Sequence, residues 1–320
     1  MNKKPILIVA GEPYSIFSEI FFKSLKKLNL KRPIILIASK KLFEKQMKKL
    51  GYKYYFREID NKLSHKIYNK KSVINIINVD FNFKKTFDKI SNKSNQYLKE
   101  CFAIANKLLR DKKAYALING PISKKNFLKN KFLGITEYLA KMNKIQNFVM
   151  LIYNKNLAVS PLTTHIALKK ISNQISKKKI INQAFLIKKF YNLLLKRNIT
   201  IGITGLNPHC ESNYKDSEEK KIIYPAIKIL KKKRYKIKGP LPADSLFMKE
   251  NIKKFDVILG MYHDQVLTPI KTIYNFDAIN ITLGLPYLRI SPDHGTNNQM
   301  LGKNKSNPTS LISAISFLNK

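Results

Sequence analysis

Three of the five histidines in this chain stand where an apolar run ends. His165, His209 and His263 each close a stretch of aliphatic and β-branched residues. Neutral imidazole is the commonest nitrogen ligand of divalent metals, and three protein ligands with an open position are typical of a catalytic metal site. The separations along the chain match no local zinc motif. The pattern therefore leaves two interpretations, one shared metal site or three histidines packed or capped at separate strand ends.

The elements that must position these histidines are predicted to be buried parallel strands. The carboxyl ends of such strands open onto the crevice where α/β sheets bind ligands. Further strand-like runs alternate with segments of helical period, and this alternation predicts an α/β fold with a mostly parallel sheet. The runs lie at 6–10, 33–38, 73–79, 114–118, 148–153 and 278–286. The fingerprint GxGxxG is absent, so an ordinary Rossmann dinucleotide site has no support.

Length and composition indicate a globular protein. A chain of 320 residues can bury a full core, as one large α/β domain or two smaller ones. No apolar run approaches the roughly 18 residues of a membrane span. The run at 5–10 is too short for a typical signal-peptide core, and the two cysteines form no CxxC pair. We expect a cytoplasmic protein with no membrane segment.

The formal net charge of +41 raises a different function class. A balance this basic is the electrostatic footprint of nucleic-acid binding. Here, however, the lysines are spread along the whole chain, which is also rich in Asn and Ile and lacks Trp. This composition favours drift of the whole sequence, rather than selection for nucleic-acid binding, as the source of the positive charge. The charge would keep a residual role in attracting anionic, phosphorylated substrates. We therefore expect no nucleic-acid partner.

Nine short segments, in order along the chain, resemble 4-hydroxythreonine-4-phosphate dehydrogenase, a family of pyridoxal phosphate biosynthesis. They lie at 11–13 (GEP), 120–124 (GPISK), 136–140 (TEYLA), 164–168 (THIAL), 205–209 (GLNPH), 239–244 (GPLPAD), 261–265 (MYHDQ), 280–286 (NITLGLP) and 293–296 (DHGT). Any one of them could arise by chance. Together they cover nearly the whole chain and are highly specific.

The resemblance implies a homodimer of subunits with an isocitrate-dehydrogenase-like fold. Each subunit would have two α/β lobes, with the active site in the cleft between them near the dimer interface. We expect residues 1–125 and about 285–320 to form the outer lobe. Residues from about 126 to 284 would form the inner, dimer-forming lobe.

The resemblance also implies NAD-dependent oxidation of 4-phosphooxy-L-threonine with decarboxylation to 3-amino-2-oxopropyl phosphate. A divalent cation, zinc, magnesium or cobalt, would be held by His165, His209 and His263. The substrate contacts carried over by position are Thr136, Lys271, Asn280 and Arg289. No general base and no NAD contact is assigned. The carboxylates Asp244, Asp264 and Asp293 are expected to support these groups rather than to react themselves.

One departure from the family pattern bears on the substrate. The family usually has His before the Thr of the TEYLA segment, and here that residue is Ile135, which cannot hydrogen-bond a phosphate or hydroxyl. An alternative within the enzyme class is therefore a dehydrogenase of another 4-phosphorylated hydroxy acid, such as phospho-threonate or phospho-erythronate. The alternative from another class is a basic nucleic-acid-binding protein on a decayed enzyme scaffold.

Overall fold

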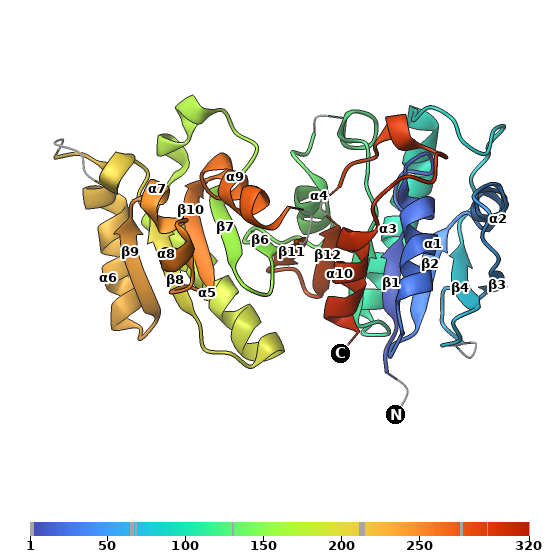
Figure 1. Cartoon of the computed structure of the whole chain (residues 1–320), viewed down its shortest axis with the longest axis horizontal. Helices are drawn as coiled ribbons and strands as arrows, with labels where there is room; N and C mark the ends of the chain where they lie inside the picture. Colours follow the sequence, from blue (N-terminus) through green and yellow to red (C-terminus); the bar gives the residue numbers. More distant parts are fainter. Residues whose placement is uncertain are drawn as a thin grey trace. The chain divides into compact units, whose positions relative to one another are not determined.

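The computed structural model describes residues 3–64, 67, 69–129, 131–210, 215–275, 278–292 and 294–319. The chain divides into two compact units (Figure 1). Unit 1 comprises Met1–Asn143 and Leu285–Lys320, and unit 2 comprises Lys144–Gly284.

Unit 1 is built on parallel strands covered on both faces. Their order is β3 (Tyr55–Glu58), β4 (Val73–Asn78), β2 (Ile34–Ala38), β1 (Ile6–Val9), β5 (Ala116–Asn119) and β12 (Leu288–Pro292). The helices are α1 (Phe17–Lys27), α2 (Lys40–Lys49), α3 (Asn95–Arg110), α4 (Ile135–Met142) and α10 (Thr309–Leu318). Leu7 and Val9 pack with α3, and the alternate residues Ile6 and Ile8 are equally buried. A strand buried on both faces reads as a continuous apolar run, as here.

Unit 2 has a mixed sheet. The order is β11 (Ile279–Leu283), β6 (Val149–Tyr153), β7 (Ala158–Thr163), β10 (Val257–Tyr262), β8 (Thr200–Thr204) and β9 (Lys236–Leu241). The last four of these strands are parallel, whereas β6 runs antiparallel to both of its neighbours. The helices are α5 (Lys177–Phe190), α6 (Tyr224–Lys232), α7 (Ala243–Leu246), α8 (Lys249–Ile252) and α9 (His263–Tyr274). The prediction of a mostly parallel α/β fold is confirmed.

The division into units falls at another residue than the expected lobe boundary. The outer lobe was expected to end at residue 125, but unit 1 continues to Asn143 because Phe127 and Leu139 pack into its core. Helix α3 begins at Asn95, directly after the 3₁₀ turn η1 (Asn92–Ser94). In the ranges described, no helix has both the length and the apolar composition needed to cross a membrane.

Candidate active site

The three histidines follow three neighbouring parallel strands of unit 2. In the sheet β10 lies between β7 and β8, with Tyr262 opposite Thr163 and Leu259 opposite Ile203. His165 comes just beyond β7, His263 begins α9 directly after β10, and His209 lies in the turn that follows β8. Parallel strands point their carboxyl ends to one edge, so all three histidines start from the same edge of the sheet.

Two of the three imidazoles lie together. The ring centres of His165 and His263 are 5.6 Å apart. Two rings that ligate one ion, each through a nitrogen about 2.1 Å from it, need centres within roughly 5 to 6 Å of each other. The Nδ1 atom of His263 lies 2.6 Å from a carboxylate oxygen of Asp264. A Nδ1–H group that donates to this carboxylate leaves the Nε2 lone pair of His263 for a metal.

The third imidazole is not brought to the other two. His209 is exposed and lies in the 3₁₀ turn η6 (Pro208–Cys210), with a φ of 55°. Among the residues that the structure describes, no group of three His, Cys, Asp or Glu side chains is placed to hold a metal ion. The donor chemistry and the His165–His263 pair fit a divalent cation, and the His209 side chain would have to turn to join them.

Two polar residues without a predicted role fix the loops around these histidines. Gln265 accepts hydrogen bonds from the Thr204 hydroxyl at 2.8 Å and the Met261 amide at 2.7 Å, and donates to the Gly205 carbonyl at 2.8 Å. It therefore ties the end of β8 to the end of β10. The other is the buried Glu219, which accepts hydrogen bonds from the chain just before His209. Gln265 was visible in the MYHDQ segment, whereas Glu219 lay outside every motif.

Unit 1 carries a buried cation whose guanidinium lies beside Asn119, the last residue of β5. Arg289, on β12, is fully buried and donates from Nε to the Asn119 side-chain oxygen at 2.8 Å and from Nη1 to the Thr136 hydroxyl at 3.3 Å. Burial lowers the pKa of Arg289 to about 10, so the guanidinium remains charged at neutral pH. The structure thus brings together two of the predicted substrate contacts, Thr136 and Arg289. The sequence analysis predicted no role for Asn119, although this residue stands at a strand end before Gly120-Pro121.

A close-packed turn supports this cluster. A Cβ atom on Gly120 would lie 2.1 Å from the Ala10 carbonyl oxygen, so only glycine allows the two chain segments to approach this closely. The adjacent Glu12 is buried, and the Ser94 hydroxyl donates a hydrogen bond to its carboxylate. Burial raises the pKa of Glu12. The sequence analysis did not predict that Glu12 is buried, because a single carboxylate in a turn gives no sequence signal of its burial.

The remaining predicted residues are placed separately. Lys271 is exposed on α9, and Asp244 is exposed on α7. Asn280 lies on β11, and its side-chain oxygen is buried without a hydrogen-bond partner in the described part of the chain. Ile135, at the start of α4, is partly buried and packs against the core of unit 1. Asp293 lies outside the described residues.

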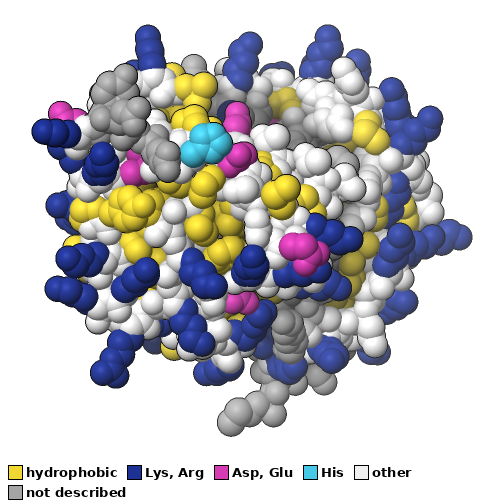
Figure 2. Space-filling model, turned by 60° about the vertical axis from the view of Figure 1, so that its left-hand side comes forward, with side chains coloured by type: hydrophobic (Ala, Val, Ile, Leu, Met, Phe, Trp, Pro, Cys, Tyr) yellow, Lys and Arg dark blue, Asp and Glu magenta, His cyan; other side chains and the backbone are white. Residues whose placement is uncertain are grey.

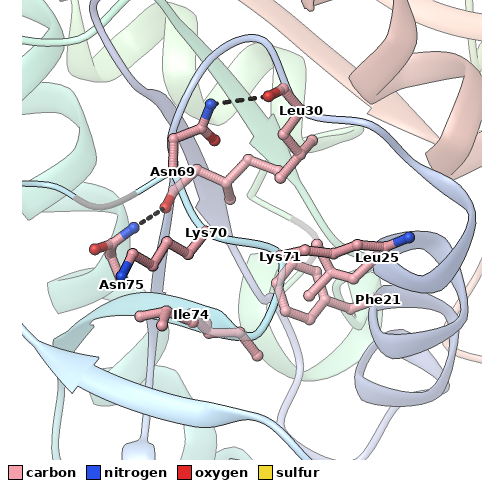
Figure 3. Close-up of a pocket in the computed structure, with 10 residues that line it drawn as sticks. Phe21, Leu25, Leu30, Asn69, Lys70, Lys71, Ile74 and Asn75 are labelled. Carbon is pink, nitrogen blue, oxygen red and sulfur yellow. Dashed lines mark hydrogen bonds between the residues drawn. The ribbon is translucent and has the colours of Figure 1, made fainter.

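A small cavity of unit 1 can be set apart from the site. It is lined by residues that include Phe21, Asn69, Lys70 and Asn75, and its volume is about 20 Å³ (Figure 3). That is room for a single water molecule. It lies beside the first residues of β2 and β4, at the amino ends of the strands, where α/β sheets do not place their ligands.

The family model described as "Pyridoxal phosphate biosynthetic protein PdxA" matches residues 29–318 of this chain. The chain belongs to this family. A 4-hydroxythreonine-4-phosphate dehydrogenase from Sulfurihydrogenibium sp. (strain YO3AOP1) is 38% identical over 97% of this chain and 96% of that protein. A putative D-threonate 4-phosphate dehydrogenase from Oceanobacillus iheyensis is 31% identical over 98% of this chain and 97% of that protein. The family resemblance drawn from the nine segments is confirmed.

Solved structures agree with the family assignment. A putative 4-hydroxythreonine-4-phosphate dehydrogenase from Salmonella typhimurium superposes on this PdxA family member with a TM-score of 0.86, at 25% identity over 99% of each chain. Isocitrate dehydrogenase from Methylococcus capsulatus shares the fold alone. Its TM-score is 0.52 at 8% identity, covering 100% of this chain and 85% of that one. The expected isocitrate-dehydrogenase-like fold is confirmed.

The positive charge of this PdxA family member is dispersed on the face drawn in Figure 2. Lys and Arg side chains are scattered over that face with apolar side chains between them, and a histidine is visible next to acidic side chains. A nucleic-acid-binding surface gathers its cations in a patch or stripe. This distribution and the family assignment favour the enzyme over the nucleic-acid-binding alternative.

Proposed function

We propose that this chain is an NAD-dependent, metal-requiring dehydrogenase that converts 4-phosphooxy-L-threonine to 3-amino-2-oxopropyl phosphate and CO₂ in pyridoxal 5'-phosphate biosynthesis. The observation that carries the proposal is the similarity to a dehydrogenase of that name over 97% of this chain and 96% of the relative. We further propose a homodimer in the cytoplasm, where NAD is available.

The proposed metal ligands are His165, His209 and His263, with Asp264 orienting His263 through the 2.6 Å contact at Nδ1. A divalent cation there supplies Lewis-acid stabilisation of negative charge on a substrate oxygen. Imidazole ligands suit zinc or cobalt better than magnesium, which prefers oxygen. The protein's own part would be to carry the three histidines at one edge of the sheet and to keep His263 in the tautomer that ligates.

Anion binding is assigned to Arg289 with Thr136. The guanidinium is held in place by Asn119 and Thr136, so it is oriented before any substrate arrives. Arginine recognises phosphate and carboxylate groups through two parallel donors, and a pre-oriented side chain loses little entropy on binding. Lys271 would act as a second, more mobile point charge. The buried side-chain oxygen of Asn280 would accept a hydrogen bond from the substrate's amine or hydroxyl group.

The reaction balances with NAD⁺ as the oxidant. The hydrogen on the hydroxyl-bearing carbon leaves with its electron pair as hydride to the nicotinamide, and the hydroxyl proton leaves to a general base that is not assigned. The product is a β-keto acid. Its carboxylate leaves as CO₂, and the electron pair of the broken C–C bond passes towards the ketone oxygen before the carbon takes up a proton.

The test is the appearance of NADH absorbance when purified protein, NAD⁺ and a divalent metal are mixed with 4-phosphooxy-L-threonine. We expect turnover that a chelator abolishes and added metal restores. 4-Phospho-D-threonate, which has a hydroxyl group in place of the amine, is the comparison substrate, because a relative carries that name. Faster turnover of phospho-threonate would overturn the substrate assignment, and chelator-resistant turnover would overturn the metal requirement.

A further inference from the structure

We infer that Glu219 is a positioning residue for His209, fixing the main chain from which this histidine would turn towards the proposed metal site. The inference rests on the proposed function, in which His209 is a metal ligand. Glu219 is the first residue of η7 (Glu219–Ile223) and is buried, with 1% of its surface exposed.

The Glu219 carboxylate binds the two residues that precede Pro208-His209. One of its oxygens accepts hydrogen bonds from the Leu206 amide at 2.8 Å and the Asn207 amide at 2.9 Å. The other accepts from the Asn207 side-chain nitrogen at 2.9 Å. Burial raises the pKa of Glu219, but the hydrogen bonds from Asn207 and Leu206 outweigh it and leave the pKa below its ordinary value. The group is therefore an anion that receives three donors from one short loop.

The loop needs such support because its backbone is strained. His209 and Cys210 have φ values of 55° and 58°, and side chains with a Cβ atom disfavour this left-handed region. Two such residues in succession persist only where the surroundings hold them. A Cβ atom on Gly205 would lie 2.7 Å from the Cys210 sulfur and 3.1 Å from a Glu219 oxygen, so the turn packs directly onto Glu219.

Removal of the carboxylate is expected to release the backbone from Leu206 to His209. The third imidazole would then have to be ordered at the moment of metal binding, and the ordering entropy would weaken the affinity. Residues that orient metal ligands typically change metal affinity by about 10- to 100-fold when they are lost. We expect Glu219→Ala to weaken metal binding within this range.

Glu218 offers a matched control. It is the neighbouring carboxylate and also contacts Asn207, accepting from its side-chain nitrogen at 3.1 Å, and it accepts from the Ser172 hydroxyl. Neither of these contacts involves the backbone amides of Leu206 and Asn207. Glu218→Ala therefore removes a charge of the same sign at almost the same place without releasing the turn.

The experiment measures zinc affinity of the full-length protein by competition with a chromogenic chelator, together with the absorption spectrum of the cobalt-loaded form. The expected order of affinity is wild type and Glu218→Ala, then Glu219→Gln, then Glu219→Ala. Glutamine keeps one oxygen for the two amides but turns an N–H group towards the Asn207 side chain. In the cobalt-loaded form we expect the absorption spectrum of Glu219→Ala to match that of His209→Ala and to differ from that of the wild type.

Other results of the zinc-affinity measurement would overturn either the role of Glu219 or the metal site itself. If Glu219→Gln and Glu219→Ala bind zinc as wild type does while His209→Ala binds weakly, the positioning role is overturned. If Glu219→Ala does not fold, Glu219→Gln decides alone, and wild-type affinity in that variant overturns the role. If His209→Ala binds as tightly as wild type, the proposed metal site itself fails. Lys23→Met, which is expected to lower stability in unit 1, checks that lost stability alone leaves zinc affinity unchanged.

Discussion

Replacing Arg289 with methionine should leave the folded protein at least as stable as the wild type and yet weaken substrate binding strongly. Arg289 is fully buried, and its guanidinium donates to Asn119 and Thr136. Methionine fills much of the same volume without a charge. Exchanging a buried charge for an apolar side chain of similar size is often neutral or stabilising.

The expected change in unfolding free energy follows from the pKa of Arg289. Its fall from 12.5 to about 10 means that folding with the charge buried costs about 3 kcal/mol. The folded pKa lies below the unfolded one, so this cost is present at every pH below about 10 and does not change between pH 6 and 9. Arg289→Met removes this cost. In the same variant the Asn119 side-chain oxygen loses its hydrogen-bond donor, which costs about 1 to 3 kcal/mol. The net change in unfolding free energy should lie between about 0 and 2 kcal/mol in favour of Arg289→Met.

The measurement is urea denaturation without ligand, followed by the KM for 4-phosphooxy-L-threonine. Loss of two hydrogen bonds from a charged group to the substrate, at about 1.5 to 3 kcal/mol each, predicts a KM at least about 100-fold higher. Arg197→Met is the control. Arg197 is half exposed and pairs with Asp256 at 2.6 Å, so neither stability nor KM should change by much. A loss of more than about 3 kcal/mol in Arg289→Met, or an unchanged KM, would show that Arg289 is a structural residue.

Three further perturbations test other parts of the chain. Asp264→Asn removes the carboxylate 2.6 Å from His263 Nδ1 and should weaken zinc binding about 10- to 100-fold in chelator competition, whereas unchanged affinity would exclude an orienting role. Burial raises the pKa of Glu12 above its ordinary 4.5, so this carboxyl lowers stability as pH rises through its folded pKa. Glu12→Gln should therefore melt at a higher temperature than wild type at pH 8 but not at pH 4 in calorimetric scans, and an equal difference at both pH values would contradict this. Lys23 donates to Glu19 at 2.7 Å and to two carbonyls of the segment 304–306, so Lys23→Met leaves a buried carboxylate and should cost about 3 kcal/mol in urea denaturation.

Much of the fold was readable from the sequence because its strands are buried on both faces. A strand such as β1 or β10 must be apolar throughout, and it then stands out from the polar helices around it. The same property made the strand ends visible, since His263 interrupts an apolar run. The unit boundary at Asn143 could not be read from the sequence, because the packing of Phe127 and Leu139 into unit 1 depends on contacts distant in sequence.

The polar supports of the site were less readable. Asn119, Gln265 and Glu219 act through hydrogen bonds to other segments of the chain. Asn119 contacts Arg289, 170 residues away, and Gln265 contacts Thr204, 61 residues away. Glu219 contacts Leu206, 13 residues away. No periodicity marks such a residue. The proposed metal ligands were chosen from residue type and position, whereas the groups that support their loops required the three-dimensional arrangement.

The exposure and backbone of the histidines bear on the two interpretations that the histidine pattern left open. Histidines packed at strand ends would be buried, but His165 and His209 are exposed, and 36% of the His263 side-chain surface is exposed. His165 and His209 both adopt left-handed backbone conformations, with φ values of 51° and 55°. At Lys129 and Lys196 such values belong to helix C-caps, where they are routine, whereas Leu63 and Asn297 show them outside C-caps. His165 and His209 cap no such helix, and their exposure agrees with the proposal that they are ligands rather than packed side chains.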